Sequence, residues 1–221
     1  MISKETLTFL KELKTNNDRD WFNENKKRFK AAEAEIKNTG NIVFEKMKMH
    51  DALDRVKLFR IYRDVRFSAN KQPYKTHFGL SFHRQKPEFR GGYYLHIEPK
   101  NSFMATGFWQ PEKNDLHRIR KEIEMDDSEM KEIINDETFQ SVWGQLKGEE
   151  VKTAPKGFNR DHPAIDLIRK KQYIFTKNLT DNEVLSKDFP ELVDQSFRAI
   201  RPYFDYMSEV LTTDLNGVSM I

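Results

Sequence analysis

The sequence of 221 residues contains no cysteine. That absence excludes disulfide bonds, thiolate zinc sites and a cysteine nucleophile, and it fits a reducing compartment. No apolar run approaches the ~20 residues that are needed to cross a bilayer. The N-terminus lacks the basic, apolar and small-residue segments of a signal peptide. We therefore expect a soluble cytoplasmic protein without a membrane partner.

Common catalytic motifs are also missing. No GxxxxGK[ST], GxGxxG or GxSxG pattern occurs, so nucleotide-binding folds and the hydrolase elbow lack support. Nothing matches HExxH or a related spacing of metal ligands, and we expect neither a metal nor a cofactor. The formal net charge is only +3, so whole-chain charge does not by itself indicate a nucleic-acid-binding protein.

Aromatic residues, by contrast, are plentiful. The chain has 17 Phe, 7 Tyr and 3 Trp, and each large ring can bury ~150–250 Å² in a core. This content, together with the small net charge, excludes the disordered class. The length suits one domain, and we find no repeat or interdomain linker, so we predict a single domain over residues 1–221.

The period of the apolar residues divides the chain into three parts. Residues 4–50 follow helical spacing and residues 111–221 mainly do, with Ser3 as a helix cap and a kink expected at Pro202, while residues 56–110 mainly alternate with period two. Strands are predicted at 57–62, 77–83, 92–98, 102–109 and 172–179, separated by short turns. The predicted fold is α+β, with a central antiparallel meander of about four to five strands packed against N-terminal and C-terminal helices.

One stretch, Arg55 to His77, concentrates the positive charge. It holds seven Lys or Arg residues and one acidic residue, Asp64, so it carries +6 while the rest of the chain sums to −3. Arginine forks bind phosphate or carboxylate with two parallel hydrogen bonds, and Pro73 stiffens the turn. We predict an anion-binding loop oriented by Asp64, with the cations Arg60, Arg63, Arg66, Lys71 and Lys75. Alternatively, these cations pair with helix carboxylates, which would give the same pattern.

Polar residues on the predicted strands are the candidates for acid–base chemistry. His77 and His83 point to one face of their strand, and His96 and Glu98 share a face of the next. If these faces coincide, then His83, His96 and Glu98 could form a proton-transfer group with Tyr94. An exposed polar face of a half-buried sheet explains the same alternation. His162, in the loop 151–162, is a further candidate base, and the alternative there is an ordinary loop with Asp161 as a helix cap.

Four segments are specific enough to indicate a family: FRIYRDVRFSANKQPYKTHFG, GGYYLHIEP, GFWQPEK and TAPKGFNRDHP. Over nearly its whole length the chain resembles family 2461 of the domains of unknown function, a family of bacterial and fungal conserved hypothetical proteins. The resemblance implies a signature at Arg60, Arg63, Asp64, Arg66, Phe67, Lys71, Pro73, Tyr74, Lys75, Gly107, Pro155, Gly157 and Phe158. It implies no established activity.

The sequence leads to one functional hypothesis and two alternatives. The first is a phosphate or carboxylate pocket built from the Arg60–Lys75 loop against the sheet, which would also suit an enzyme acting on a small phosphorylated or nucleotide-like substrate. The second is a nucleic-acid-binding protein, because Phe59, Tyr62, Phe67 and Tyr74 alternate with the basic residues. The third is a non-catalytic structural or interaction module whose arginines are paired internally. The reaction and the oligomeric state are left open.

Overall fold

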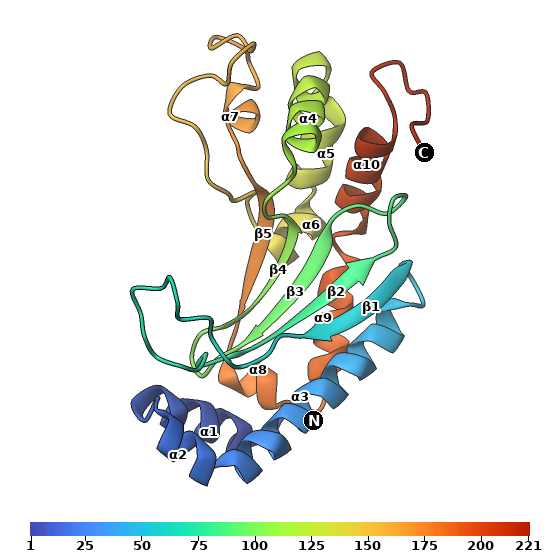
Figure 1. Cartoon of the computed structure of the whole chain (residues 1–221). Helices are drawn as coiled ribbons and strands as arrows, with labels where there is room; N and C mark the ends of the chain where they lie inside the picture. Colours follow the sequence, from blue (N-terminus) through green and yellow to red (C-terminus); the bar gives the residue numbers. More distant parts are fainter. The chain divides into compact units, whose positions relative to one another are not determined.

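The computed structural model describes residues 1–221 and confirms the α+β class (Figure 1). Five strands form one open antiparallel sheet in the order β1-β2-β3-β4-β5. Their bounds are β1 Leu53–Leu58, β2 Phe78–Arg84, β3 Gly92–Ile97, β4 Ser102–Phe108 and β5 Tyr173–Leu179. The predicted meander is therefore confirmed, and the fifth strand joins it after a long helical segment.

The chain also has ten helices. Their bounds are α1 Lys4–Thr15, α2 Arg19–Glu24, α3 Lys26–Met47, α4 Lys113–Met125, α5 Ser128–Asn135, α6 Glu137–Trp143, α7 Ile165–Ile168, α8 Asp181–Leu185, α9 Phe189–Arg198 and α10 Arg201–Thr212. Ser3 caps α1 by accepting a hydrogen bond from the Thr6 backbone N–H. None of these helices is both long and apolar enough to span a membrane.

Two predicted elements have different bounds in the structure. The strand expected at 57–62 is found at Leu53–Leu58. Beyond Leu58 the regular pairing stops, and only the isolated bridge Tyr62–Tyr74 follows. The C-terminal helix is two helices rather than one kinked helix. Pro202 lies in the first turn of α10, where its missing N–H costs no helical hydrogen bond.

The contacts of the chain form two compact units, each discontinuous in sequence. The first comprises Met1–His83, Tyr94–Met104 and Asn178–Gln195, and the second Arg84–Tyr93, Ala105–Lys177 and Ser196–Ile221. Strands β2, β3, β4 and β5 contribute residues to both units. The single domain inferred from the sequence stays a prediction.

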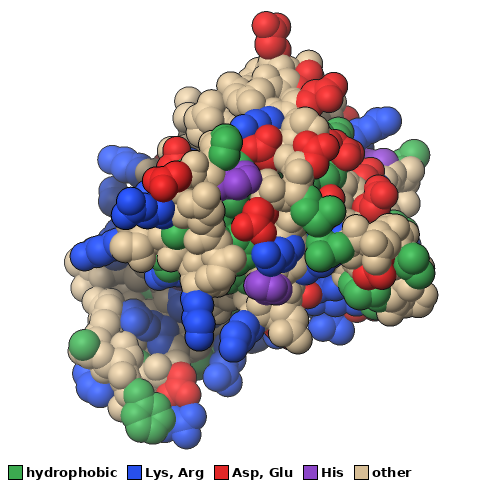
Figure 2. Space-filling model, turned by 90° about the horizontal axis from the view of Figure 1, so that it is seen from above, with side chains coloured by type: hydrophobic (Ala, Val, Ile, Leu, Met, Phe, Trp, Pro, Cys, Tyr) green, Lys and Arg blue, Asp and Glu red, His purple; other side chains and the backbone are tan.

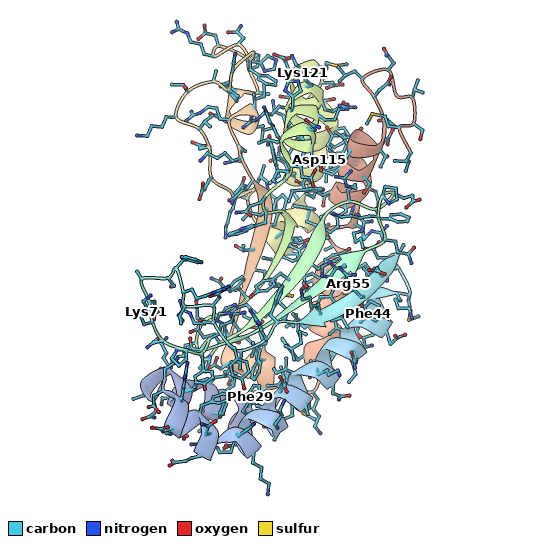
Figure 3. All side chains as sticks on the ribbon, in the orientation of Figure 1. Phe29, Phe44, Arg55, Lys71, Asp115 and Lys121 are labelled. Atoms are coloured by element: carbon cyan, nitrogen blue, oxygen red, sulfur yellow. The ribbon has the colours of Figure 1, made fainter.

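In the first unit, α3 packs against both α1 and β1, and aromatic rings fill the space between them. Phe29, labelled in Figure 3, has its ring centroid 5.1 Å from that of Phe22 and 6.3 Å from that of Phe78 on β2. Phe78, Leu80 and Phe82 are all buried, as their alternation predicts. One face of β2 thus packs into the core, and polar side chains of the strand lie on its other face.

In the second unit, α10 packs against α4 and α5. Its core is again aromatic, with Phe175 on β5 lying 5.0 Å from Phe139 and 5.2 Å from Tyr203, centroid to centroid. Asp115 on α4, labelled in Figure 3, is paired with Arg90. Gly107 has φ +118° and lies against the backbone of Tyr173, where a Cβ would come within 2.2 Å of the carbonyl oxygen. That close approach requires glycine at position 107.

Candidate functional site

The basic segment leaves the sheet at the end of β1 and returns at β2. Its two arms remain paired, because Phe59 N–H donates to the Gly79 carbonyl (2.9 Å) and Lys75 N–H to the Ile61 carbonyl (2.8 Å). The last bond between the arms runs from Arg63 N–H to the Pro73 carbonyl (2.9 Å). Residues 64–72, which we call the loop tip, project beyond this bond (Figure 1). Lys71 lies on this projection (Figure 3).

A side chain from the α1–α2 turn holds the returning arm in place. The Asn17 amide donates to the Tyr74 carbonyl (3.0 Å), and its oxygen accepts from the Tyr74 N–H (3.1 Å). The ring of Tyr74 stacks on Phe22 at 3.9 Å between centroids with an interplanar angle of 13°. The base of the loop is therefore fixed to the helices by two hydrogen bonds and a buried stack.

Within the loop tip, two of the predicted anion ligands have partners in the protein. The Arg66 guanidinium donates two hydrogen bonds to the Asp64 carboxylate, from Nε to Oδ1 at 3.0 Å and from Nη2 to Oδ2 at 2.7 Å. These bonds from Arg66 hold the pKa of Asp64 below its usual value. Lys71 Nζ donates to the Val65 carbonyl at 3.0 Å. Asp64 thus orients Arg66, as the sequence predicts for one arginine of the loop.

The other three predicted ligands, Arg60, Arg63 and Lys75, have no such partner, and we call them the cation cluster. Each lies more than 4.0 Å from any carboxylate oxygen. The pKa of Lys75 is lowered first by burial and then by the charges of Arg60 and Arg63. Arg60 and Arg63 are therefore close enough to Lys75 to repel it. The nearby acid Asp64, whose pKa Arg60 also lowers, forms its hydrogen bonds with Arg66.

Phe59 connects the cation cluster to the sheet. Lys57 and Lys75 place their ammonium groups 5.3 and 5.5 Å from the centre of its ring. The same ring lies 6.2 Å from that of Tyr94 on β3. Cation–π attraction of this kind stabilises a cation by ~0.5–2 kcal/mol without neutralising its charge.

The adjoining part of the sheet carries four residues that we call the histidine face: His77, Tyr94, His96 and Glu98. The rings of His77 and His96 lie 4.1 Å apart between centroids, and Phe103 on β4 stacks on the other side of His96 at 4.6 Å. His96 and Glu98 are 7% and 9% exposed. This is the buried end of the polar face that the alternation predicts.

Glu98 receives four donors. Its Oε2 lies 2.8 Å from Asn101 Nδ2 and 3.3 Å from His96 Nε2. Its Oε1 lies 3.2 Å from Thr76 Oγ1 and 3.5 Å from Lys14 Nζ. Burial alone would raise the pKa of Glu98, but the hydrogen bonds and the Lys14 charge outweigh it and lower the pKa. Glu98 is therefore an ionised carboxylate in a fixed position.

The charge on Glu98 decides the tautomer of His96. Burial is the main reason why the pKa of His96 is lowered, so its ring is neutral and carries one N–H. That proton belongs on Nε2, which faces the carboxylate, because a carboxylate only accepts. Nδ1 then accepts from the Tyr94 hydroxyl at 3.1 Å. Tyr94, His96 and Glu98 form a directed chain of hydrogen bonds, Tyr94 to His96 to Glu98.

His77 is a neutral imidazole without a hydrogen-bond partner in the protein. Its pKa is lowered to about 4, first by burial and then by His96. Lys75 and Arg63 make smaller contributions that also lower it. Only the Glu98 charge acts in the opposite sense. A lone pair on His77 is thus available beside the cation cluster at neutral pH.

The structure places the remaining candidates elsewhere. His83 lies farther along β2, with its Nε2 2.9 Å from Ser81 Oγ, and His77 takes the place beside His96 that we assigned to His83. His162 belongs to the second unit, where its Nδ1 accepts from the Ala164 N–H at 3.1 Å. Phe158 also belongs to that unit and packs against His117 and Lys121 of α4. Sequence reasoning missed three contributors to the site, His77, Lys14 and Asn17.

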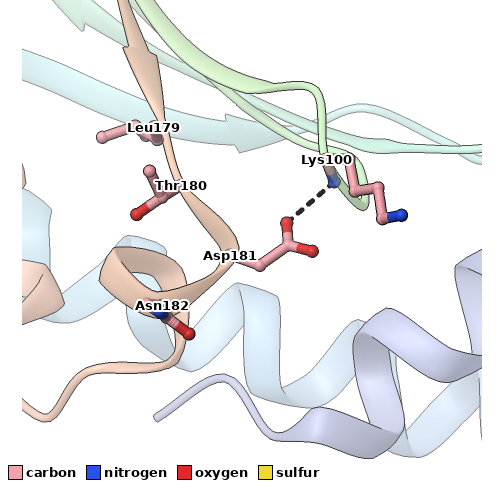
Figure 4. A pocket seen from close by; sticks show the side chains of 5 residues that line it. All are labelled: Lys100, Leu179, Thr180, Asp181 and Asn182. Atoms are coloured by element: carbon pink, nitrogen blue, oxygen red, sulfur yellow. Dashed lines mark hydrogen bonds between the residues drawn. The ribbon is translucent and has the colours of Figure 1, made fainter.

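No group of three His, Asp or Glu side chains is arranged to hold a metal ion. A shallow pocket of about 340 Å³ lies in the first unit, lined by Lys100, Leu179, Thr180, Asp181 and Asn182 (Figure 4). Asp181 there accepts from the Lys100 backbone N–H at 2.8 Å. Its lining has a single cation, Lys100, and no histidine, so we assign the candidate site to the cation cluster and the histidine face.

Comparison with known proteins gives one match. The family model described as "Conserved hypothetical protein (DUF2461)" matches residues 5–206. No curated protein and no solved structure matches the chain.

Proposed function

The chain belongs to the DUF2461 family of conserved hypothetical proteins, whose description names no activity, and we propose that it binds a small phosphate or carboxylate anion at the cation cluster. One observation carries the proposal. Arg60, Arg63 and Lys75 have no carboxylate oxygen within 4.0 Å, and the charges of Arg60 and Arg63 lower the pKa of Lys75 in addition to burial. A bound anion would relieve that repulsion, and each charge-assisted hydrogen bond to it would contribute roughly 1.5–3 kcal/mol.

The neighbouring histidine face supports an enzyme acting on a small phosphorylated or nucleotide-like substrate. Because His77 is neutral and has no partner, it can accept a proton from a hydroxyl or amine of a molecule held by the cation cluster. Glu98 and His96 keep the adjoining ring stack in one orientation. In this role His77, rather than one of the histidines named from the sequence alone, would transfer the proton.

The alternative of a structural module with internally paired arginines has support at one residue only. Arg66 is paired with Asp64, whereas Arg60 and Arg63 are not paired. The two classes of arginine on one loop provide a matched comparison. Arg63→Gln should remove anion binding, and Arg66→Gln should leave it within about twofold, because Asp64 already neutralises Arg66.

The experiment measures inorganic phosphate and citrate binding by calorimetry and thermal shift for the wild type, Arg63→Gln and Arg66→Gln. At 100 times its dissociation constant, an anion should stabilise the wild type by about 2.7 kcal/mol, which is about 5–10 °C in Tm for a chain of this size. Absence of a shift in the wild type, or equal shifts in the wild type and Arg63→Gln, would overturn the proposal.

A further inference from the structure

The loop tip presents an aromatic ring to solvent. Phe67 is 96% exposed, the highest value among the large hydrophobic side chains of the chain. The Arg66 guanidinium lies 5.9 Å from the centre of this ring. Since Asp64 grips Arg66 from the side, the guanidinium is fixed beside the ring instead of moving freely in water. The projecting loop thus carries an exposed ring with a guanidinium held over it.

A second ring, Tyr62, stands at the base of the same loop. It is 48% exposed, and it is held in place by Phe22 and Tyr74, whose centroids lie 5.8 and 5.5 Å away. Tyr74 itself is 4% exposed and tied to Asn17. Tyr62 is therefore a rigid, half-exposed ring separated from Phe67 by five positions along the chain.

Positive charge surrounds both rings. Residues 59–75 contain the cations Arg60, Arg63, Arg66, Lys71 and Lys75 and the single acid Asp64, so five positive charges less one negative leave +4. Figure 2 shows Lys and Arg side chains gathered on a projecting part of the surface at its lower left, around exposed hydrophobic side chains and one acidic side chain. Rings between cations are the arrangement that binds single strands, in which bases stack on rings and phosphates follow the positive charge.

We infer that this loop binds single-stranded nucleic acid, with a base stacked on Phe67 and Arg66 and the backbone phosphates on the cation cluster. The inference rests on the proposed anion site, because it names the anion as a phosphodiester. A duplex keeps its bases stacked inside and offers no free face to Phe67. A membrane surface fits less well, because the loop tip contains Asp64, Asn70 and Gln72 and only one aromatic ring.

The test uses fluorescence anisotropy with labelled oligonucleotides of about 12 nucleotides, both DNA and RNA, at about 50 and 200 mM salt. We expect the single strands to bind more tightly than the matching duplex. The salt dependence should have a log–log slope of about −2 to −3, as three to four phosphate contacts require. Phe67→Ala should weaken binding about tenfold, and Phe67→Trp should restore it, since stacking needs a ring.

Two controls separate this inference from the proposed anion site. Met49→Ala removes an 87% exposed apolar side chain elsewhere in the first unit and should leave affinity unchanged. Phe67→Ala should also keep the wild-type affinity for inorganic phosphate. The inference fails if wild-type protein binds phosphate but no oligonucleotide, if Phe67→Ala binds the strand as the wild type does, or if vesicles with anionic lipid bind and single strands do not. If the wild-type protein does not bind phosphate, the proposed anion site itself is contradicted.

Discussion

The imidazole rings of His77 and His96 lie 4.1 Å apart, and the structure makes both of them neutral. His96 is directed by Glu98, whereas His77 has no hydrogen-bond partner and lies beside the cation cluster. A buried neutral histidine makes the free energy of unfolding depend on pH, because the unfolded chain binds a proton at pH values where the folded chain does not.

The first prediction concerns this dependence. The pKa of His77 is about 4 in the folded protein against an ordinary 6.5, so the unfolded state binds more protons between these values. Its contribution to stability is therefore intact above pH 6.5 and is lost as the pH falls toward 4. The full shift corresponds to about 3 kcal/mol, and because the ring is only partly buried we expect about 1–2 kcal/mol.

Urea denaturation of the wild type and of His77→Phe between these pH values measures the effect. The phenyl ring keeps the stack on His96 but cannot titrate. The difference in unfolding free energy between the two proteins should change with pH in favour of the variant as the pH falls. A constant difference across the range would contradict the buried, neutral state of His77.

The second prediction concerns Arg63 in the absence of anions. Because Arg63 repels Lys75 and has no carboxylate partner, Arg63→Gln should leave stability unchanged or raise it by up to about 1 kcal/mol. Asp64→Asn, which removes the partner of Arg66, should instead lower stability slightly, because the pair that it breaks is exposed. Chemical denaturation in a buffer without phosphate or carboxylate gives both values. Marked destabilisation by Arg63→Gln would favour the module with internally paired arginines.

The third prediction concerns Asn17. Asn17→Ala removes two hydrogen bonds to the Tyr74 backbone and leaves both groups with only water to bind, so we expect a loss of about 1–3 kcal/mol. Asn23→Ala, on the exposed surface of α2, is the matched control and should cost less than about 0.5 kcal/mol. Anion affinity should fall in the first variant only. Equal midpoints of urea denaturation for the two variants would contradict the anchoring role.

The fourth prediction concerns Gly79. A Cβ at this position would lie 2.7 Å from the Tyr94 hydroxyl oxygen, so Gly79→Ala must displace Tyr94 and its hydrogen bond to His96. We expect a cost of about 1–3 kcal/mol from this overpacking. Tyr94→Phe should cost less in the Gly79→Ala background than alone, because the hydrogen bond that it removes is already lost there. Simple additivity in a double-mutant cycle would contradict this coupling.

The alternating strands could be predicted from sequence because period two is a local property. Phe78, Leu80 and Phe82 had to share a face, and they are buried together. The same spacing brought Tyr94, His96 and Glu98 to one face, where they form a chain of hydrogen bonds. Local spacing was sufficient to predict which side chains share a face wherever the interacting residues belong to one strand.

The rest of the site depends on relations that spacing does not contain. His77 directly precedes β2 and His83 lies on it, and only the register between β2 and β3 decides which of them meets His96. Lys14 reaches Glu98 across 84 positions of sequence, and Asn17 reaches Tyr74 across 57. Whether a given arginine of the loop is paired depends on side-chain directions, which composition cannot supply.

The hydrogen bonds of Asn17 also have a consequence for association. Tyr62 and Tyr74 face each other without exchanging hydrogen bonds, so the N–H and carbonyl of Tyr74 point away from the paired arm toward an open edge. An open edge of this kind is a template on which a strand from another molecule can add. The amide of Asn17 occupies both groups at that position. A single side chain thereby closes the returning arm to intermolecular β-pairing, and its removal should promote aggregation as well as unfolding.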